Sequence, residues 1–363
     1  MTSILILLLL ALIFVYVNGF HDTANSIATV VSTRALTPHQ AILLATVTNL
    51  AGALVGTAVA ATIAHGLVDT SFITTNTILC ALVGAIVWDL LTWWWGMPTS
   101  SSHALIGGLC GAALAAAHNN WAGIIWAAPG GTHWWEGNGI FFKVIVPMFV
   151  SPLLGFLGAF ILAGILYLVL RNWSVVRVDR VFGRLQIFSG GYIGFAHGHN
   201  DAQKTMGVVV LALVAATKAG TLDQLPGWLG FLRTQEAGAG EPMLVATWLK
   251  VACAITLAAG TAAGGWRIIQ TMGRKITELK PIHGFAAETT AATVLTAAAA
   301  WGFPVSTTHT ITAAVSAVGA SRRFKAVRMS VVKRILWAWV FTLPGSALAA
   351  YLAMLILQLL GAK

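Results

Sequence analysis

The residues best suited to binding a small ligand form a motif that occurs twice. Residues Trp95 to His103 read W-G-M-P-T-S-S-S-H, and Trp301 to His309 read W-G-F-P-V-S-T-T-H. The proline disfavours helix in the residue before it and can itself begin a new helix. The hydroxyl residues then fall on the cap and first turn, where several backbone N–H groups lack a partner within the helix. Such a helix end carries partial positive charge and suits an oxyanion.

Each copy of the motif contains three consecutive hydroxyl residues that could donate hydrogen bonds to a bound anion: Ser100, Ser101 and Ser102 in the first copy, and Ser306, Thr307 and Thr308 in the second. A single hydroxyl at a helix start could equally serve as a cap. The repetition of the whole set favours ligand contact. We therefore predict that the two helix ends converge on one anion near the middle of the fold.

A second repeated pattern carries two acids. The pattern G-x-x-D-x-x-x-[ST] begins at Gly19 and again at Gly198, which pairs Asp22 with Asp201. An anion site flanked by two acids is electrostatically reasonable only if cations bind with the anion or the acids take up protons. Carboxylate, amide and hydroxyl oxygens suit a hard cation. We predict a cation-coupled anion site whose coupling residues are these: Asp22, Asn25, Asp201 and, more weakly, Glu288.

Lys204 breaks the symmetry between the two patterns, because it takes the place that Asn25 holds in the first. It could form a structural ion pair with Asp201, occupy the position of a cation, or contact the anion directly. If Lys204 occupies the position of a cation, its charge would favour the ionised form of Asp201. Asp22 would then be the better proton carrier, which favours H+ over Na+ as the coupling ion. The rival interpretation is a Na+ site at Asp22 and Asn25.

The composition places these motifs in a membrane protein. Of the 363 residues, 58% are hydrophobic and only 9% are charged, whereas soluble domains carry about 25% charged residues. The mean hydropathy of +0.82 agrees. This composition excludes a soluble enzyme, a nucleic-acid binder and a disordered chain. The net charge of +10 then reflects basic loops on the cytoplasmic side of a membrane.

Ten apolar segments are long enough to cross or enter a bilayer. They lie at roughly 3–33, 40–64, 72–95, 103–118, 140–170, 185–217, 243–263, 284–301, 305–320 and 335–360. The first and the sixth are polar in the middle, which indicates a broken helix or a re-entrant hairpin, so we expect 10–12 segments. If the loops rich in Lys and Arg are cytoplasmic, ten spans fit and both termini lie outside.

The chain is predicted to consist of two inverted repeats. Trp301 follows Trp95 by 206 residues, Asp201 follows Asp22 by 179, and a looser T-x-x-x-G-x-x-x-G match recurs after 208. We assign residues 1–170 to the first repeat, 171–184 to a basic cytoplasmic linker and 185–363 to the second repeat. Counting crossings puts Pro98 nearer the cytoplasmic face and Pro304 nearer the outer face. Inverted repeats with broken helices are typical of secondary transporters that work by alternating access.

Five histidines adjoin the motifs: His21, His103, His197, His199 and His309. They lack a fixed metal-ligand spacing within either repeat, so we predict no metal site and no cofactor, and we favour proton transfer or hydrogen bonding. An intramembrane Ser/His hydrolase is the enzyme alternative. It is disfavoured, because the chain has no G-x-S-x-G motif and a nucleophile would not need duplication. We therefore expect a transporter and not an enzyme.

At these motifs the sequence resembles the inorganic phosphate transporter (Pit/PiT) family. The strings G-F-H-D-T-A-N-S from Gly19 and G-H-N-D-A-Q-K from Gly198 are similar to its paired signatures, and the two P-x-S-[ST]-[ST]-H strings to its second pair. The resemblance implies an inverted-repeat fold that imports inorganic phosphate with H+ or Na+. It also adds Asn200 and Lys204 to the phosphate-binding residues.

Lys204 and Gln203 resemble those of bacterial low-affinity members, which are associated with protons and metal–phosphate complexes. The resemblance therefore implies a multi-pass protein of the bacterial inner membrane. Its expected partners are phosphate, a coupling cation and the lipid bilayer, with self-association into a homo-oligomer left open and no nucleic acid. Some bacterial relatives carry sulfate, so a sulfate permease of the same fold is the alternative.

Overall fold

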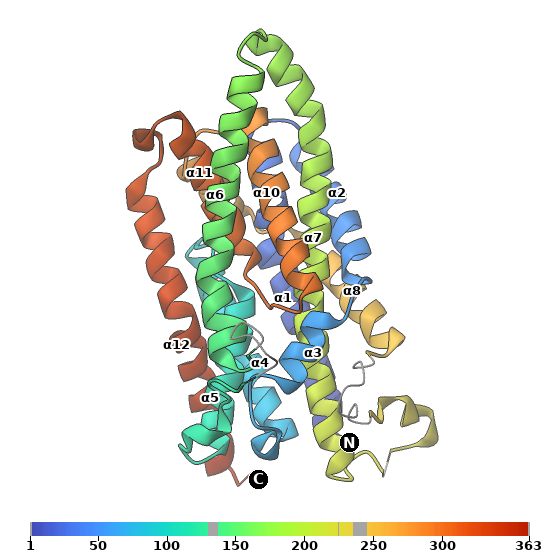
Figure 1. Ribbon diagram of the computed structural model, residues 1–363. Coiled ribbons are helices and arrows are strands. Elements are labelled where there is room, and N and C mark those ends of the chain that lie inside the picture. The colour runs from blue at the N-terminus through green and yellow to red at the C-terminus, as the bar shows by residue number, and fades with distance from the viewer. Residues whose placement is uncertain (1, 130–136, 224, 235–244, 362–363) are drawn as a thin grey trace.

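The computed structural model describes residues 2–129, 137–223, 225–234 and 245–361, and these residues are almost entirely helical (Figure 1). The helices are α1 (Thr2–Ser32), α2 (Pro38–Ala53), α3 (Ala58–His65), α4 (Thr75–Trp94), α5 (Ser101–Ala116), α6 (Val146–Val169), α7 (Val175–Lys218), α8 (Thr247–Ala263), α9 (Trp266–Gln270), α10 (Pro281–Ala300), α11 (Thr307–Arg322) and α12 (Met329–Leu359). Among the described residues only isolated β-bridges occur outside the helices and turns. The predicted all-α class is confirmed.

Two helical hairpins carry the repeated W-G-x-P motif at their tips. Helices α4 and α10 have 20 residues each, and α5 and α11 have 16 each. Figure 1 shows α4 and α5 in the half of the molecule that holds both chain ends, and α10 and α11 in the half that holds the connection between α6 and α7. The two hairpins therefore enter the molecule from opposite ends.

The hairpin tips meet inside the molecule, because the rings of His103 and His309 lie 4.8 Å apart. This arrangement corrects the expectation that Pro98 and Pro304 lie near opposite faces. The prediction counted the helices before and after each proline as two successive crossings of the membrane. In the structure each proline lies in the turn of a hairpin, whose two arms pack on each other.

The first and sixth apolar segments are not broken, contrary to the sequence-based expectation. Helix α1 runs without interruption through residues 18–26, and α7 through 197–205. Their polar side chains are buried against other helices, so the low hydropathy marks contact with protein and not an interruption. Sharp bends occur elsewhere, at 68° between α2 and α3 and at 60° between α8 and the segment that begins with α9.

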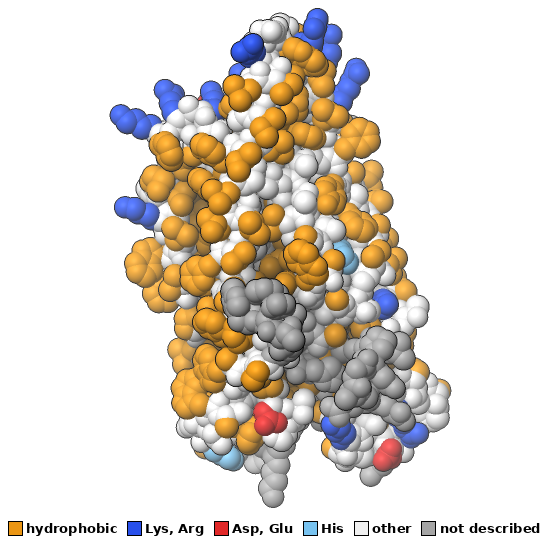
Figure 2. Space-filling view, in the orientation of Figure 1, with side chains coloured by type: hydrophobic (Ala, Val, Ile, Leu, Met, Phe, Trp, Pro, Cys, Tyr) orange, Lys and Arg blue, Asp and Glu red, His pale blue; other side chains and the backbone are white. Residues whose placement is uncertain are grey.

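Four helical segments are long and apolar enough to cross a membrane, and six if each bent pair counts as one span. These four are Thr2–Ser32, Thr75–Trp94, Phe141–Val169 and Met329–Leu359. Other predicted segments form helices that are too short or too polar by the same measure. Residues 175–184, which the sequence assigned to a linker, form the first turns of α7. Lys and Arg side chains gather at that end of the molecule (Figure 2).

Two apolar cores fill the molecule, one around the first half of α1 and helices α4, α5 and α12, and the other around the second half of α1 and helices α10 and α11. Along α1, Val15 is the last member of the first core and Ala24 begins the second. The intervening residues Asn18, His21 and Asp22 are polar and buried. A layer of buried polar side chains therefore lies where the two cores meet.

Candidate functional site

The candidate site lies in this polar layer, where α1 and α7 pass the tips of both hairpins. All twelve predicted site residues are at most 3% exposed, and all but Glu288 belong to this layer: Asp22, Asn25, Ser100, Ser101, Ser102, Asn200, Asp201, Lys204, Glu288, Ser306, Thr307 and Thr308. A charge held inside a membrane protein is costly unless it has a partner. The contacts of each charged group therefore indicate what the site can bind.

Lys204 connects Asp201 to both hairpins. Its Nζ donates to Asp201 Oδ1 at 2.5 Å, to the Val305 carbonyl at 2.7 Å and to the Ser102 hydroxyl. Ser102 lies at the start of α5, and Val305 lies in the turn before α11. One ammonium group thus holds three oxygen atoms from α7 and the two hairpin tips. All three partners are of the kind that would bind a small hard cation.

Asn200 strengthens the same corner of the site. Its Nδ2 lies 2.9 Å from the Val305 carbonyl, 3.0 Å from Asp201 Oδ1 and 3.4 Å from Thr307 Oγ1. The amide therefore fixes the Asp201 carboxylate against the second hairpin. Two predicted phosphate-binding residues, Asn200 and Lys204, are thus brought to the hairpin tips.

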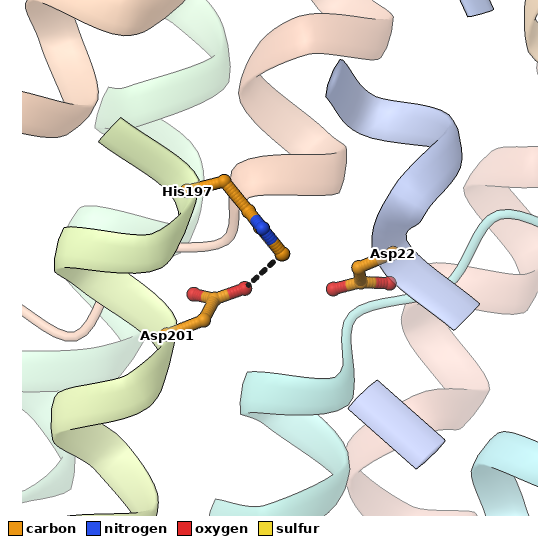
Figure 3. A group of neighbouring side chains, drawn as sticks. All are labelled: Asp22, His197 and Asp201. Atoms are coloured by element: carbon orange, nitrogen blue, oxygen red, sulfur yellow. Dashed lines mark ion pairs between the residues drawn. The ribbon is translucent and has the colours of Figure 1, made fainter. Parts of the chain in front are cut away.

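His197 extends from α7 toward the two acids, as Figure 3 shows, and its Nε2 lies 3.0 Å from Asp201 Oδ2. The ring's Nδ1 contacts Asn49 Oδ1, and Asn49 Nδ2 donates to the Ala45 carbonyl. Asn49 therefore accepts a hydrogen bond from Nδ1–H. Nε2 then faces the Asp201 carboxylate, where a cation could be bound by both groups.

Asp22 has a similar contact with His21. The His21 Nδ1 lies 2.7 Å from Asp22 Oδ1, and its Nε2 lies 3.2 Å from Thr92 Oγ1. The Thr92 hydroxyl also lies within hydrogen-bond distance of the Trp88 and Asp89 carbonyls, at 3.0 and 3.2 Å. The His21 imidazole and the Asp22 carboxylate therefore lie close enough to exchange a proton.

Equivalent residues of the two repeats make equivalent contacts with the hairpin tips. Asn25 of α1 donates to Thr308 Oγ1 at the tip of the second hairpin, at 2.9 Å. The equivalent residue of α7, Lys204, donates to Ser102 at the tip of the first hairpin. Ser102 and Thr308 occupy the same position in the two copies of the motif. Each repeat therefore contacts the hairpin of the other, and the main departure from symmetry is the charge on Lys204.

The six hydroxyl residues divide into two groups. The Oγ atoms of Ser100 and Ser306 accept hydrogen bonds from the backbone N–H of His103 and His309, at 3.2 Å in both cases, so these two serve as caps. The remaining four, Ser101, Ser102, Thr307 and Thr308, lie on the first turns of α5 and α11. Within the described part of the chain, Ser101 Oγ has no hydrogen-bond partner.

Glu288 lies apart from this cluster. Its carboxylate accepts hydrogen bonds from Gln186 Nε2 at 2.8 Å and from the Ser189 hydroxyl, both on α7. Gln186 in turn accepts a hydrogen bond from Thr33 at 2.7 Å. In the described residues these contacts form a separate polar group about three turns of α7 away from Asp201. The structure therefore does not join Glu288 to the other candidate coupling residues.

The position of His197 beside both Asp22 and Asp201 was not predicted from the sequence. The ligand atoms of Asp22, His197 and Asp201 lie within 4.8 Å of one another (Figure 3), a grouping that could hold a metal ion. The spacing of His197 and Asp201 puts them on one helix face, but Asp22 comes from the other repeat. Asp89 of α4, which carried no prediction, is also fully buried.

The chain is similar to known proteins over nearly its whole length. The sequence model described as the phosphate transporter family matches residues 18–350. A probable low-affinity inorganic phosphate transporter of Bacillus subtilis is 38% identical over 98% of this chain and 97% of its own length. A protein of Rhizobium meliloti with the same description is 42% identical over 95% of this chain and 94% of its own length.

A solved structure gives the same picture for the fold. A protein described as the sodium-dependent phosphate transporter superposes with a TM-score of 0.81 and 25% sequence identity, over 99% of this chain and 100% of that one. The likeness extends over both hairpins and both repeats.

Proposed function

This chain belongs to the phosphate transporter family, and we propose that it imports inorganic phosphate together with a cation by alternating access. The observation that carries the proposal is the meeting of two opposed hairpins at two buried acids, with Lys204 bonded to both tips. Because the family is one of transporters, the hydrolase alternative receives no support. A site enclosed by elements from opposite ends can open to either end when one hairpin moves.

Phosphate is proposed to bind between the first turns of α5 and α11. Those turns carry the hydroxyl residues Ser101, Ser102, Thr307 and Thr308, and they lie close together, since the rings of His103 and His309 are 4.8 Å apart. Two helix N-termini there add partial positive charge. Asn200 and Lys204 lie at the edge of the same region. Ser100 and Ser306 would contribute indirectly, by capping the helices that present the donors.

The coupling ion is proposed to be H+ carried by the His21–Asp22 pair. His21 Nδ1 lies 2.7 Å from Asp22 Oδ1, so the imidazole can pass a proton to and from the carboxylate. Asp201 is different, because the ammonium of Lys204 supplies it with a fixed positive charge at 2.5 Å. Asp22 has no Lys or Arg among its ion-pair partners in the described residues. A proton that binds at Asp22 as phosphate binds, and leaves with it, would couple the two fluxes.

The phosphate is proposed to travel, in part, as a complex with a divalent metal ion. Asp22, His197 and Asp201 supply two carboxylates and one imidazole within 4.8 Å. Carboxylate and imidazole ligands suit divalent ions such as Mn2+ or Zn2+. In this arrangement the metal is cargo, and it would be bound by His197 and the two carboxylates.

The protein is proposed to lie in a bacterial inner membrane with its basic end in the cytoplasm. Figure 2 shows Lys and Arg concentrated at the end that carries the α6–α7 connection. Figure 1 places both chain ends at the opposite end. The excess of basic residues on the cytoplasmic side then leaves both termini outside.

Competition by other oxyanions tests the choice of substrate. Uptake of labelled phosphate into proteoliposomes should fall when arsenate is added, since arsenate has the same shape and retains a proton that can donate a hydrogen bond. Sulfate has no such proton at neutral pH and should compete poorly. Strong competition by sulfate and weak competition by arsenate would establish the sulfate permease instead.

A further inference from the structure

A cavity lies away from the central site, at the basic end of the molecule. It has a volume of about 510 Å3 and is formed by the end of α6, the start of α7, the start of α10 and the end of α11. Figure 1 shows that these helix ends lie near the α6–α7 connection. Cavities of this size accommodate small ligands or lipid headgroups.

The cavity is strongly positive. Arg171, Lys280 and Arg322 line it, and Asp179 is the one acid among its lining residues. The ion pairs found in the described residues all involve Asp22 or Asp201, so none of these three cations forms an ion pair there, and the cations outnumber the acid three to one. Lys280 is also the N-cap residue of α10, and this helix N-terminus carries partial positive charge. The cavity therefore suits a phosphate group.

A buried hydrogen-bond pair adds a neutral donor. His283, which is 3% exposed, accepts a hydrogen bond on Nδ1 from the Lys280 N–H at 3.0 Å. Its Nε2 therefore carries the proton and donates to the Tyr167 hydroxyl at 2.7 Å. The Tyr167 O–H remains available to donate within the cavity, to Ser321 or to a ligand oxygen. This arrangement orients a donor independently of the three cations.

The remaining walls are apolar, with Leu166, Leu170 and Ile282 among the lining residues. On the outer side of α6, Leu168 is 71% exposed and Val169 is 69% exposed. In a membrane protein such side chains face the acyl chains of the bilayer. A free phosphate ion would need no apolar wall beside its charged contacts. The combination instead matches a phosphate joined to acyl chains.

We propose that this cavity binds the headgroup phosphate of an anionic glycerophospholipid from the cytoplasmic leaflet. Basic pockets between transmembrane helices are suited to such headgroups. Because the cavity joins the α6–α7 connection to both arms of the second hairpin, the bound lipid would hold that hairpin to α6 and α7. The lipid is therefore also expected to stabilise the folded protein.

Thermal unfolding of purified, delipidated protein tests the proposal. Short-chain phosphatidylglycerol should raise the unfolding temperature, whereas phosphatidylcholine of equal chain length should not. The variant Arg171→Gln/Lys280→Gln/Arg322→Gln should bind phosphatidylglycerol roughly a hundredfold more weakly, since each surface cation contributes about a fivefold change in affinity. The matched control Lys325→Gln/Lys333→Gln/Arg334→Gln removes the same charge from the same end outside the cavity, and it should respond like the unchanged protein.

Three results would overturn the proposal: an equal response to phosphatidylcholine, an equal phosphatidylglycerol response in the triple variant, or the loss of that response in the control variant. Inorganic phosphate is a separate probe, because it can also bind at the central site. If a phosphate-dependent shift disappears in the triple variant, the cavity binds the free anion and not a lipid. The single variant Arg322→Gln keeps the test valid should the triple variant not fold, and it should weaken lipid binding about fivefold.

Discussion

Replacing Lys204 with asparagine is the perturbation that best separates the two coupling ions. Asparagine is the residue at the equivalent position, Asn25, of the first repeat. The Lys204 ammonium contacts Asp201 Oδ1 at 2.5 Å, the Val305 carbonyl at 2.7 Å and the Ser102 hydroxyl. Asparagine can retain a polar contact with a hairpin tip, but it supplies no charge to Asp201.

The size of the effect follows from the burial of both groups, which are 1% and 2% exposed. Removing one partner of a buried ion pair costs about 3–5 kcal/mol, because the other charge is left uncompensated. The lower figure corresponds to roughly a hundredfold change in an equilibrium or a rate. Proton-driven uptake by Lys204→Asn should therefore fall about a hundredfold, and Na+ should restore part of it by replacing the ammonium.

The assay compares uptake into proteoliposomes at a fixed membrane potential with a pH gradient alone or a Na+ gradient alone. The unchanged protein should respond to the pH gradient without Na+. Lys204→Arg keeps the charge and should not acquire a Na+ response, and Asn25→Gln is the matched neutral change in the other repeat. Size-exclusion profiles establish that each variant is folded.

Strict Na+ dependence of the unchanged protein, with no effect of the pH gradient, would refute the assignment of the proton to His21–Asp22. Undiminished proton-driven uptake by Lys204→Asn would refute the role of Lys204 as the fixed charge at Asp201. In that case Lys204 would be only a structural partner of the carboxylate.

Three other changes test the remaining parts of the site. Asp22→Asn and Asp201→Asn should each abolish coupled uptake while the protein stays folded, because the shape of the side chain is kept; uptake at the normal rate and normal expression would remove that carboxylate from the site. Ser101→Ala or Thr307→Ala should weaken apparent phosphate affinity about tenfold, since a hydrogen bond to a charged group contributes about 1.5–3 kcal/mol; an unchanged concentration dependence would contradict this. Glu288→Gln should leave phosphate affinity within about twofold, because its hydrogen bonds go to residues away from the hairpin tips; a tenfold loss in the same assay would show that it belongs to the site.

The repeated motifs located two helix starts that lie together in the structure. A proline followed by hydroxyl residues favours the start of a helix, and the duplicated motif therefore predicts two such starts. The structure brings Ser102 to Lys204 and Thr308 to Asn25 across the two repeats. These contacts depend on the arrangement of helices, but the helix ends that make them could be recognised in the sequence.

The path of the backbone was harder to predict, because hydropathy does not distinguish a polar residue that faces protein from one that interrupts a helix. Residues 18–26 of α1 are polar and nearly all buried, yet the helix continues through them. His197 was missed as a partner of Asp22 for a related reason. The two residues come from different repeats, and only the packing of α1 against α7 brings them together.

The most direct test of the central claim is accumulation of labelled phosphate by proteoliposomes that contain the purified protein and no internal phosphate. The structure places two acids, each in contact with a histidine, beside the converging helix ends, so phosphate entry should require a cation. Phosphate should accumulate above its external concentration only under an inward cation gradient, and the accumulation should collapse when an ionophore removes that gradient. Rapid flux that ignores the gradient and stops at equal concentrations would show a channel, and it would contradict transport coupled at this site.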